Sequence, residues 1–157
     1  MSQLSPSPLV VDGSEFKFGI VAARYNDVYV SGLIEKVVET LKESKVPESA
    51  IVIERVPGSN ELPVAAKWMA ETGEYDAIIA LGTVIKGGTH HDIMVADGSN
   101  YGLHKVALET RICMVNGVIA GETEEQVAER CTGAMSKGES FGQCALEMAQ
   151  LRRGYVK

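Results

Sequence analysis

Residues 75–92 read YDAIIALGTVIKGGTHHD, and this stretch decides the fold. Its first seven residues form a largely apolar run that is typical of a buried strand. The remainder contains glycines, threonines, a lysine and two histidines, and a helical pattern comes after it. Ligands of open α/β sheets bind where a buried strand turns towards a helix. Backbone N–H groups at such a turn favour an anion such as phosphate, and a nearby imidazole can carry protons near neutral pH.

Strand-like and helix-like patterns alternate on both sides of this stretch. Strands are expected at residues 16–23, 50–56, 77–83 and 112–119. Helices are expected at residues 28–44, 61–71, about 95–110, 123–131 and 138–152, with Pro63 in a first turn and a capping box at Thr123 and Gln126. This order predicts the α/β class, with helices on both faces of a four-stranded parallel sheet. We expect residues 1–13 to form a flexible N-terminal arm and residues 14–157 a single domain.

The composition argues against several classes of protein. The 157 residues carry a net charge of −6 and no basic run, which argues against binding to nucleic acid. No apolar run approaches the ~20 residues of a membrane span, and the N-terminus lacks the pattern of a secretory signal. The three cysteines lack CxxC spacing, so we expect reduced thiols in a cytoplasmic protein. Cys113 and Cys144 have apolar neighbours and are expected in the core.

Polar segments come directly after the predicted strands, and the ends of parallel strands meet at one edge of a sheet. Four clusters are expected there: residues 24–27, residues 56–61, residues 82–91, and Asn116 with the residues after it. Each also has a structural interpretation. Tyr25 could be a surface aromatic, and Glu61 could be stabilised in the first turn of a helix. Helix caps would explain Asn26, Ser59 and Asn60. Residues 87–89 could form an ordinary loop, and Arg130 and Lys137 could be solvated surface charges. Their shared location makes them candidates for binding.

The adjacent histidines, His90 and His91, do not have the spacing of a metal site. Neighbouring residues point apart, no second histidine stands four residues away, and no cysteine motif accompanies the pair. We therefore expect one structural and one functional histidine, and no metal.

Several collinear segments make the chain resemble the 6,7-dimethyl-8-ribityllumazine synthase family over about residues 16–151. These segments are FGIVAARYN (18–26), VPGSNELP (56–63), ALGTVIKGGT (80–89) with His91, Gly117, TEEQ (123–126), Arg130, Lys137 with Gly138, and ALEMA (145–149). The resemblance implies a flavodoxin-like α/β/α sandwich and a transferase of riboflavin biosynthesis that needs no cofactor. Such enzymes condense 5-amino-6-(D-ribitylamino)uracil with 3,4-dihydroxy-2-butanone 4-phosphate to the lumazine, and release phosphate and water.

The resemblance also implies roles for individual residues. Tyr25 would stack on the pyrimidine ring, and His91 would shuttle protons while His90 takes no part. The other expected contacts are Ser59, Asn60 and Glu61 to the ribityl chain, Thr83, Val84 and Ile85 around the ring, and Gly88 and Thr89 to the phosphate. Arg130 would reach the phosphate from a neighbouring subunit. Asn26, Asn116 and Lys137 complete the expected substrate-binding set.

The chain departs from the family mainly in the ring-binding half of this set. The family usually has Phe at the position of Tyr25, a bulky residue at Asn60, Phe or Tyr at Asp92, and often Phe at Asn116. A carboxylate at Asp92 would raise the basicity of His91 if the two side chains approach. The segment between Arg130 and Lys137 is about one residue shorter than usual, whereas the phosphate-binding residues are intact.

The same resemblance leaves two alternatives and implies an assembly. One alternative is the related archaeal-type riboflavin synthase, which dismutates two lumazines. That reaction needs no phosphate site, so the glycine-rich loop favours the lumazine synthase. A non-catalytic flavin or lumazine carrier, or a shell-forming scaffold, stays open because of Asn60 and Asn116. Family members form homopentamers, or capsids of twelve pentamers, with sites between subunits and riboflavin synthase as an expected partner. We expect a pentamer as the minimal unit.

Overall fold

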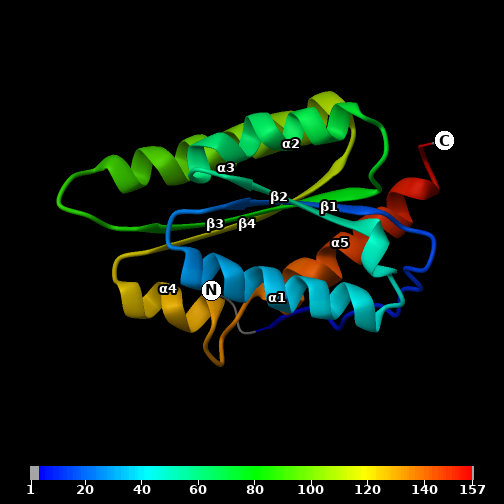
Figure 1. Cartoon of the computed structure of the whole chain (residues 1–157), viewed down its shortest axis with the longest axis horizontal. Coiled ribbons are helices and arrows are strands. Elements are labelled where there is room, and N and C mark those ends of the chain that lie inside the picture. Colours follow the sequence, from blue (N-terminus) through cyan, green and yellow to red (C-terminus); the bar gives the residue numbers. More distant parts are fainter. Residues whose placement is uncertain (1–3, 157) are drawn as a thin grey trace.

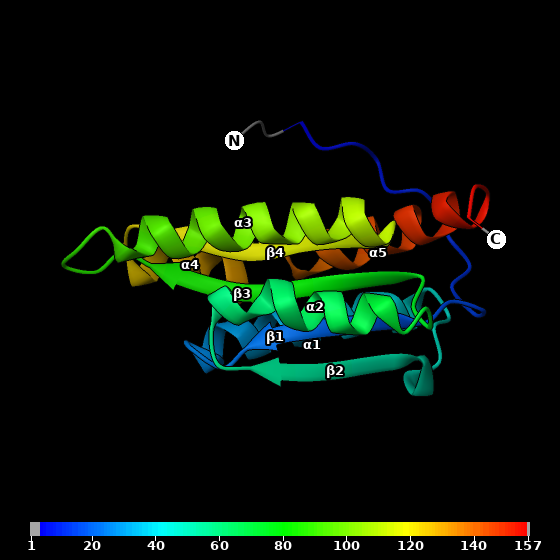
Figure 2. The ribbon, with the colours of Figure 1, turned by 90° about the horizontal axis from the view of Figure 1, so that it is seen from above.

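The computed structural model describes residues 4–156 as a parallel sheet between two layers of helices (Figure 1). The strands are β1 (Phe18–Ala23), β2 (Ile51–Val56), β3 (Ala77–Ile85) and β4 (Cys113–Gly121). The helices are α1 (Asp27–Glu43), α2 (Leu62–Glu71), α3 (His91–Thr110), α4 (Glu124–Cys131) and α5 (Gly138–Arg153), with short 3-10 turns η1 (Glu48–Ala50) and η2 (Ser59–Glu61). Helices α2 and α3 cover one face, and α1, α4 and α5 cover the other (Figures 1 and 2). The predicted three-layer α/β/α sandwich is confirmed.

The strand order is β2-β1-β3-β4, and all neighbours are parallel. This order is that of a flavodoxin-like sheet. The chain leaves β1 towards β2 on one side and later returns to place β3 on the other side. The carboxyl ends of β1 and β3 therefore flank a crevice, which is where open α/β sheets bind ligands.

Apolar residues on alternate positions of the strands build two cores. Ile20 and Ile79 pack with α1 and α5, whereas Val21 and Ile78 pack with α2 and α3. All six residues of β1 are buried, because the strand is central and covered on both faces. This explains why the sequence of β1 is apolar without alternation.

Strand β3 runs farther than its neighbour β1. The last pair between them is Ala22 with Leu81, and the next four residues of β3 pair with β4 alone, ending at Ile85 with Gly121. The predicted third and fourth strands each ended two residues too early. Pairing between β3 and β4 sustains this extension, and a single segment does not reveal such a partner.

Two predicted boundaries near the crevice were wrong. Helix α3 begins at His91 and not near Val95, because its exposed first turn, including Ile93 and Met94, lacks apolar periodicity. Asn116 was grouped with the residues after the fourth strand, but it lies within β4, opposite Ala80, as the predicted strand at residues 112–119 requires. Its side chain accepts a hydrogen bond from Val118 N–H and donates to Asn100 Oδ1 at 2.7 Å. These bonds accommodate a polar residue inside the strand.

The cysteines are distributed differently from the prediction. Cys131 is fully buried, whereas Cys113 is half-buried and Cys144 is exposed. The expectation of Cys144 in the core was wrong, because α5 turns Ala145 and Ala149 inward and Cys144 outward. Cys113 is only partly buried but packs against the core, as expected. Burial raises the pKa of the Cys131 thiol to about 11.

The two ends of the domain are tied down by hydrogen bonds. Leu9 N–H donates to Glu147 Oε1 at 2.9 Å, and Gln143 Nε2 donates to Leu9 O at 2.6 Å, so part of the predicted arm lies along α5. Residues 1–3 of that arm lie outside the described residues. At the end of α5, Arg153 forms two bonds with the carboxylate of Asp76, at 2.7 and 3.0 Å. The Lys17 N–H donates to the same carboxylate at 2.8 Å.

The predicted helix starts are largely present. Pro63 stands in the first turn of α2, and Thr123 Oγ1 accepts from Gln126 N–H at the start of α4. Gln126 Oε1 accepts from Glu122 N–H, one residue before the position that a capping box requires. No helix in residues 4–156 is long and apolar enough to cross a membrane.

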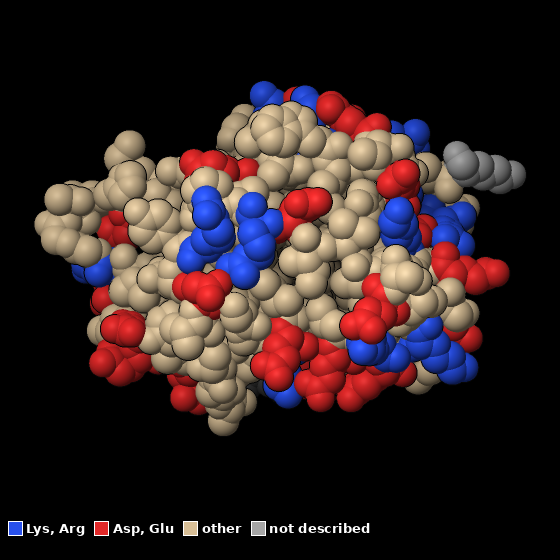
Figure 3. All heavy atoms as spheres, viewed as in Figure 1, with Lys and Arg blue, Asp and Glu red and all other residues tan. Residues whose placement is uncertain are grey.

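Acidic side chains gather along the lower edge of the face in Figure 3, where α1 and α4 lie in Figure 1. Lysine and arginine side chains form small separate groups on that face. The basic groups are often paired with acids, as Arg55 is with Asp27 at 2.6 Å. The face in view therefore has no broad basic surface of the kind that binds nucleic acid.

Candidate functional site

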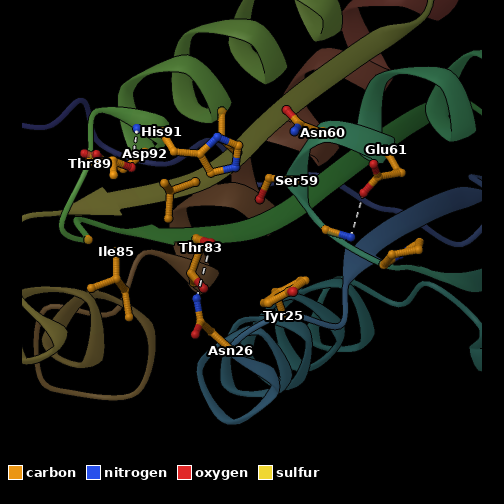
Figure 4. Close-up of a pocket in the computed structure, with 15 residues that line it drawn as sticks. Tyr25, Asn26, Ser59, Asn60, Glu61, Thr83, Ile85, Thr89, His91 and Asp92 are labelled. Atoms are coloured by element: carbon orange, nitrogen blue, oxygen red, sulfur yellow. Dashed lines mark hydrogen bonds between the residues drawn. The ribbon is translucent and has the colours of Figure 1, made fainter.

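A cavity of about 620 Å³ opens at the carboxyl ends of β1 and β3 (Figure 4). Its lining comprises Tyr25, Asn26, Pro57, Gly58, Ser59, Asn60, Glu61, Thr83, Val84, Ile85, Gly87, Thr89, His91, Asp92 and Val95. The segments after β1 and β2 therefore share one cavity with the end of β3 and the start of α3. The predicted convergence of three of the four clusters is confirmed.

The segment after β1 places a ring and an amide at the mouth of the cavity. Tyr25 is 72% exposed, so its aromatic face is open to a ligand. Asn26 precedes α1 in the left-handed conformation, with φ 55°, and makes no capping bond through its side chain. Its Nδ2 instead donates to Thr83 O at 3.5 Å. Asn26 thus links the end of β1 to the open edge of β3, and its strained backbone is of the kind that clusters at functional sites.

The turn after β2 is fixed by its own hydrogen bond. Gly58 N–H donates to Glu61 Oε2 at 2.9 Å, which closes η2 and holds the carboxylate near the cavity. Ser59 is only 5% exposed and packs against β3 at Gly82. A Cβ atom at position 82 would lie 2.4 Å from Ser59 Oγ. Glycine at this position is therefore what allows the serine hydroxyl to reach the strand.

The loop from Lys86 to His90 offers unused backbone donors. The amides of Gly87, Gly88 and Thr89 donate to no group in the part of the chain that the structure describes. Thr89 Oγ1 accepts from His91 N–H at 3.4 Å, which ties the loop to the first turn of α3. Free N–H groups beside a helix N-terminus are suited to an anion.

His91 reaches into the cavity from the first residue of α3 (Figure 4). The side chain is exposed, and its imidazole makes no hydrogen bond within residues 4–156. An imidazole in this setting is free to exchange protons with a ligand. His90 is also exposed but does not line the cavity.

Three buried polar atoms in the cavity wall lack partners. They are Ser59 Oγ, Thr83 Oγ1 and Asp92 Oδ1, none of which forms a hydrogen bond with the described residues. Thr83 is 4% exposed. A buried polar atom without a partner destabilises the folded state by about 1–3 kcal/mol. Three such atoms around one cavity leave hydrogen bonds that water or a ligand in the cavity can make.

Four predicted site residues do not line this cavity. Gly88 belongs to the glycine loop and is exposed between Gly87 and Thr89, outside the lining. Arg130 lies in α4, where its Nη1 donates to Gln126 O at 2.9 Å, and Lys137 precedes α5. Asn116 is held by Asn100 on α3. The single chain thus brings together the ring-side groups and the glycine loop, with Gly88 just outside the lining, and leaves Arg130, Lys137 and Asn116 elsewhere.

Several lining residues were missing from the predicted set. Pro57 and Gly58 were interpreted as turn residues only, and Gly87 as part of the loop. Val95 and Asp92 enter the cavity because α3 begins earlier than its apolar pattern suggests. The departure of Asp92 from an aromatic was the available signal for its role. No group of three or more His, Cys, Asp and Glu side chains within residues 4–156 could hold a metal ion.

Comparison with known proteins gives the family. The family model described as 6,7-dimethyl-8-ribityllumazine synthase matches residues 15–153. A 6,7-dimethyl-8-ribityllumazine synthase of Halorhodospira halophila is 43% identical over 138 residues, covering 87% of this chain and 88% of the relative. Enzymes of the same name from Paraburkholderia phymatum and Burkholderia multivorans are 37% and 36% identical over 141 residues, covering 90% of this chain and 80% of each relative. The chain therefore belongs to the 6,7-dimethyl-8-ribityllumazine synthase family.

Proposed function

We propose that this cavity is where the chain carries out the reaction of its family, a step of riboflavin biosynthesis. The reaction condenses 5-amino-6-(D-ribitylamino)uracil with 3,4-dihydroxy-2-butanone 4-phosphate to 6,7-dimethyl-8-ribityllumazine, and phosphate and water leave. One observation carries the proposal. A single cavity joins an open aromatic face and three unpartnered buried polar atoms to a glycine loop with free amides.

The glycine loop is the proposed phosphate end of the site. Gly88 and Thr89 would bind the phosphate through N–H groups and the threonine hydroxyl, and the N-terminus of α3 adds a favourable dipole. The free amides of the loop support this role. The loop also lies next to His91, so a phosphate leaving from this end would depart within reach of a proton donor.

The opposite wall is the proposed ring end. Tyr25 would stack on the pyrimidine, with Thr83, Val84 and Ile85 at its edge. The turn formed by Ser59, Asn60 and Glu61 would bind the ribityl hydroxyls. The burial of Ser59 and Thr83 without hydrogen-bond partners supports these contacts, because a polyhydroxylated ligand supplies donors and acceptors together.

His91 is the proposed proton carrier. Imine formation between the amine and the ketone, and elimination of phosphate, both require protons to move at neighbouring atoms. A single imidazole facing the cavity can accept and return them. Holding two substrates in one cavity would supply much of the remaining acceleration.

Arg130, Lys137 and Asn116 would complete the site from a neighbouring subunit of a homopentamer in the cytoplasm. Arg130 has its guanidinium on the surface of α4, away from the cavity of its own chain, and this supports a contact in trans. A bidentate guanidinium would clamp the phosphate that the loop amides bind. Light scattering should then find an oligomer, and a stable, active monomer would contradict the assignment.

Formation of the lumazine from both substrates, monitored by its fluorescence, tests the function directly. His91→Ala should slow turnover by about 10²–10⁴-fold, the scale of one general acid–base group. His90→Ala is the matched control, because its exposed side chain lies outside the cavity, and it should keep wild-type turnover. Full turnover by His91→Ala would show that His91 is not the proton carrier. Tight flavin binding by wild-type protein without any product would overturn the reaction itself.

A further inference from the structure

Asp92 brings an unpaired carboxylate to the wall of the cavity. It is the second residue of α3 and lies beside His91 (Figure 4). Both residues line the cavity together with Val95. The Oδ1 atom of Asp92 is buried and has no hydrogen-bond partner among the described residues. An acidic residue in a first helical turn is favoured by the helix dipole, but that explains a solvated carboxylate and not a buried oxygen without a donor.

The surroundings indicate what kind of group would satisfy this oxygen. No lysine or arginine within residues 4–156 lines the cavity, so a single chain provides no cation for the carboxylate. The other carboxylate of the wall, Glu61, already accepts from Gly58 N–H. Ser59 and Thr83, the two remaining unpartnered groups, are hydroxyls that can donate as well as accept. The ionised Asp92 carboxylate is therefore the one group of the three that can only accept, and it requires an N–H or O–H donor from a molecule in the cavity.

We propose that Asp92 is a specificity-determining residue that accepts a hydrogen bond from an N–H group of the pyrimidine ring substrate. This inference rests on the proposed function, because it takes the aminouracil as the occupant. An uncharged ring bearing amino groups suits a carboxylate, whereas a phosphate would be repelled by it. Asp92 thereby places a polar contact at the start of α3, at a position where the family usually has an aromatic side chain.

Equilibrium binding measured by calorimetry tests the proposal without turnover. The probes are 5-amino-6-(D-ribitylamino)uracil and 5,6-diaminouracil, the same ring without the ribityl chain. Asp92→Asn keeps the shape but replaces the accepting carboxylate with an amide, and should raise Kd for both probes by about 10–100-fold, the scale of one hydrogen bond to a charged group. Asp97→Asn, on the exposed surface of the same helix and outside the cavity, is the matched control and should leave both Kd values unchanged.

Several results would overturn the proposal. These are a Kd within twofold of the wild type in Asp92→Asn, a loss confined to the probe with the ribityl chain, or wild-type protein that binds neither probe. A change in the binding of inorganic phosphate alone, or in the oligomer by light scattering, would equally assign Asp92 to another role. Asp92→Ala, which removes the acceptor without adding bulk, gives a second variant with the same expected loss if the first fails to fold. Lumazine formation by the wild type, measured separately, decides the proposed function independently.

Discussion

The contact between Gly82 and Ser59 gives a sharp prediction about how β3 shapes the cavity. In Gly82→Ala the new Cβ atom would lie 2.4 Å from Ser59 Oγ and 3.1 Å from Leu62 Cδ1. Carbon and oxygen atoms in ordinary contact lie about 3.5 Å apart, so the Ser59 hydroxyl must move by about 1 Å. Both Ser59 and Leu62 are buried, and neither can move outward freely. The substitution therefore has two effects at once: it strains the core and it displaces one wall of the site.

The expected magnitudes come from this geometry. Overpacking of a core destabilises by about 1–3 kcal/mol, which corresponds to a Tm lower by about 3–10 °C for a chain of this size. Displacement of a binding group by ~1 Å can reduce turnover by about 10²-fold. We expect Gly82→Ala to show both losses, in thermal unfolding at fixed protein concentration and in lumazine formation.

A double variant separates the two effects. Ser59→Ala removes the Oγ atom, and the nearest remaining contact with residue 59 becomes its Cβ at 3.4 Å. Gly82→Ala with Ser59→Ala should therefore regain most of the lost Tm, but not the activity that depends on the hydroxyl. Gly98→Ala in α3 is the control, because its Cβ meets nothing within 4 Å and alanine favours a helix. A Tm of Gly82→Ala within about 1 °C of the wild type, or no recovery in the double variant, would refute the steric argument.

Two further predictions concern the stability and reactivity of the scaffold. Asp76→Ala removes the carboxylate that accepts hydrogen bonds from Arg153 and from the Lys17 N–H, and it should lower Tm by about 3–10 °C. Glu74→Ala is the control, because Glu74 forms an exposed ion pair with Lys17, and it should shift Tm by about 1 °C at most. Equal losses in the two variants would contradict the role of the buried carboxylate. Because burial raises the pKa of Cys131 to about 11, its thiol stays protonated at about pH 8. Mass spectrometry after treatment with iodoacetamide should find Cys144 alkylated while Cys131 reacts only on unfolding, and early labelling of Cys131 in folded protein would disprove its burial.

The sheet could be predicted from the sequence because its signals are local. Residues 77–81 are buried on both faces, and such strands read as continuous apolar runs. Once the strands were placed, the rule that parallel strands end at one edge brought Tyr25, Ser59 and His91 together correctly. The predicted order of helices and strands therefore located most of the candidate site.

What the sequence did not reveal depends on contacts across the chain. The start of α3 was missed because its first turn is exposed and has no apolar period. Asn116 was grouped with the polar residues after the fourth strand, although a bond to Asn100 on α3 holds it inside β4. The close approach of Ser59 to Gly82 joins two segments that are distant in sequence, so no local pattern contains it.

The unequal lengths of β1 and β3 affect how this site tolerates mutation. Past Leu81, β3 is held by β4 on one side only, and the opposite edge, where Thr83 O accepts from Asn26, faces the cavity. Hydrogen bonds from that edge belong to the backbone, so they do not depend on which side chain occupies the position. A side chain of the cavity wall such as that of Asn60 can therefore be replaced while the edge keeps its donors and acceptors. A substitution to proline on this part of β3 is the exception, because proline has no N–H and would remove a backbone donor from the strand.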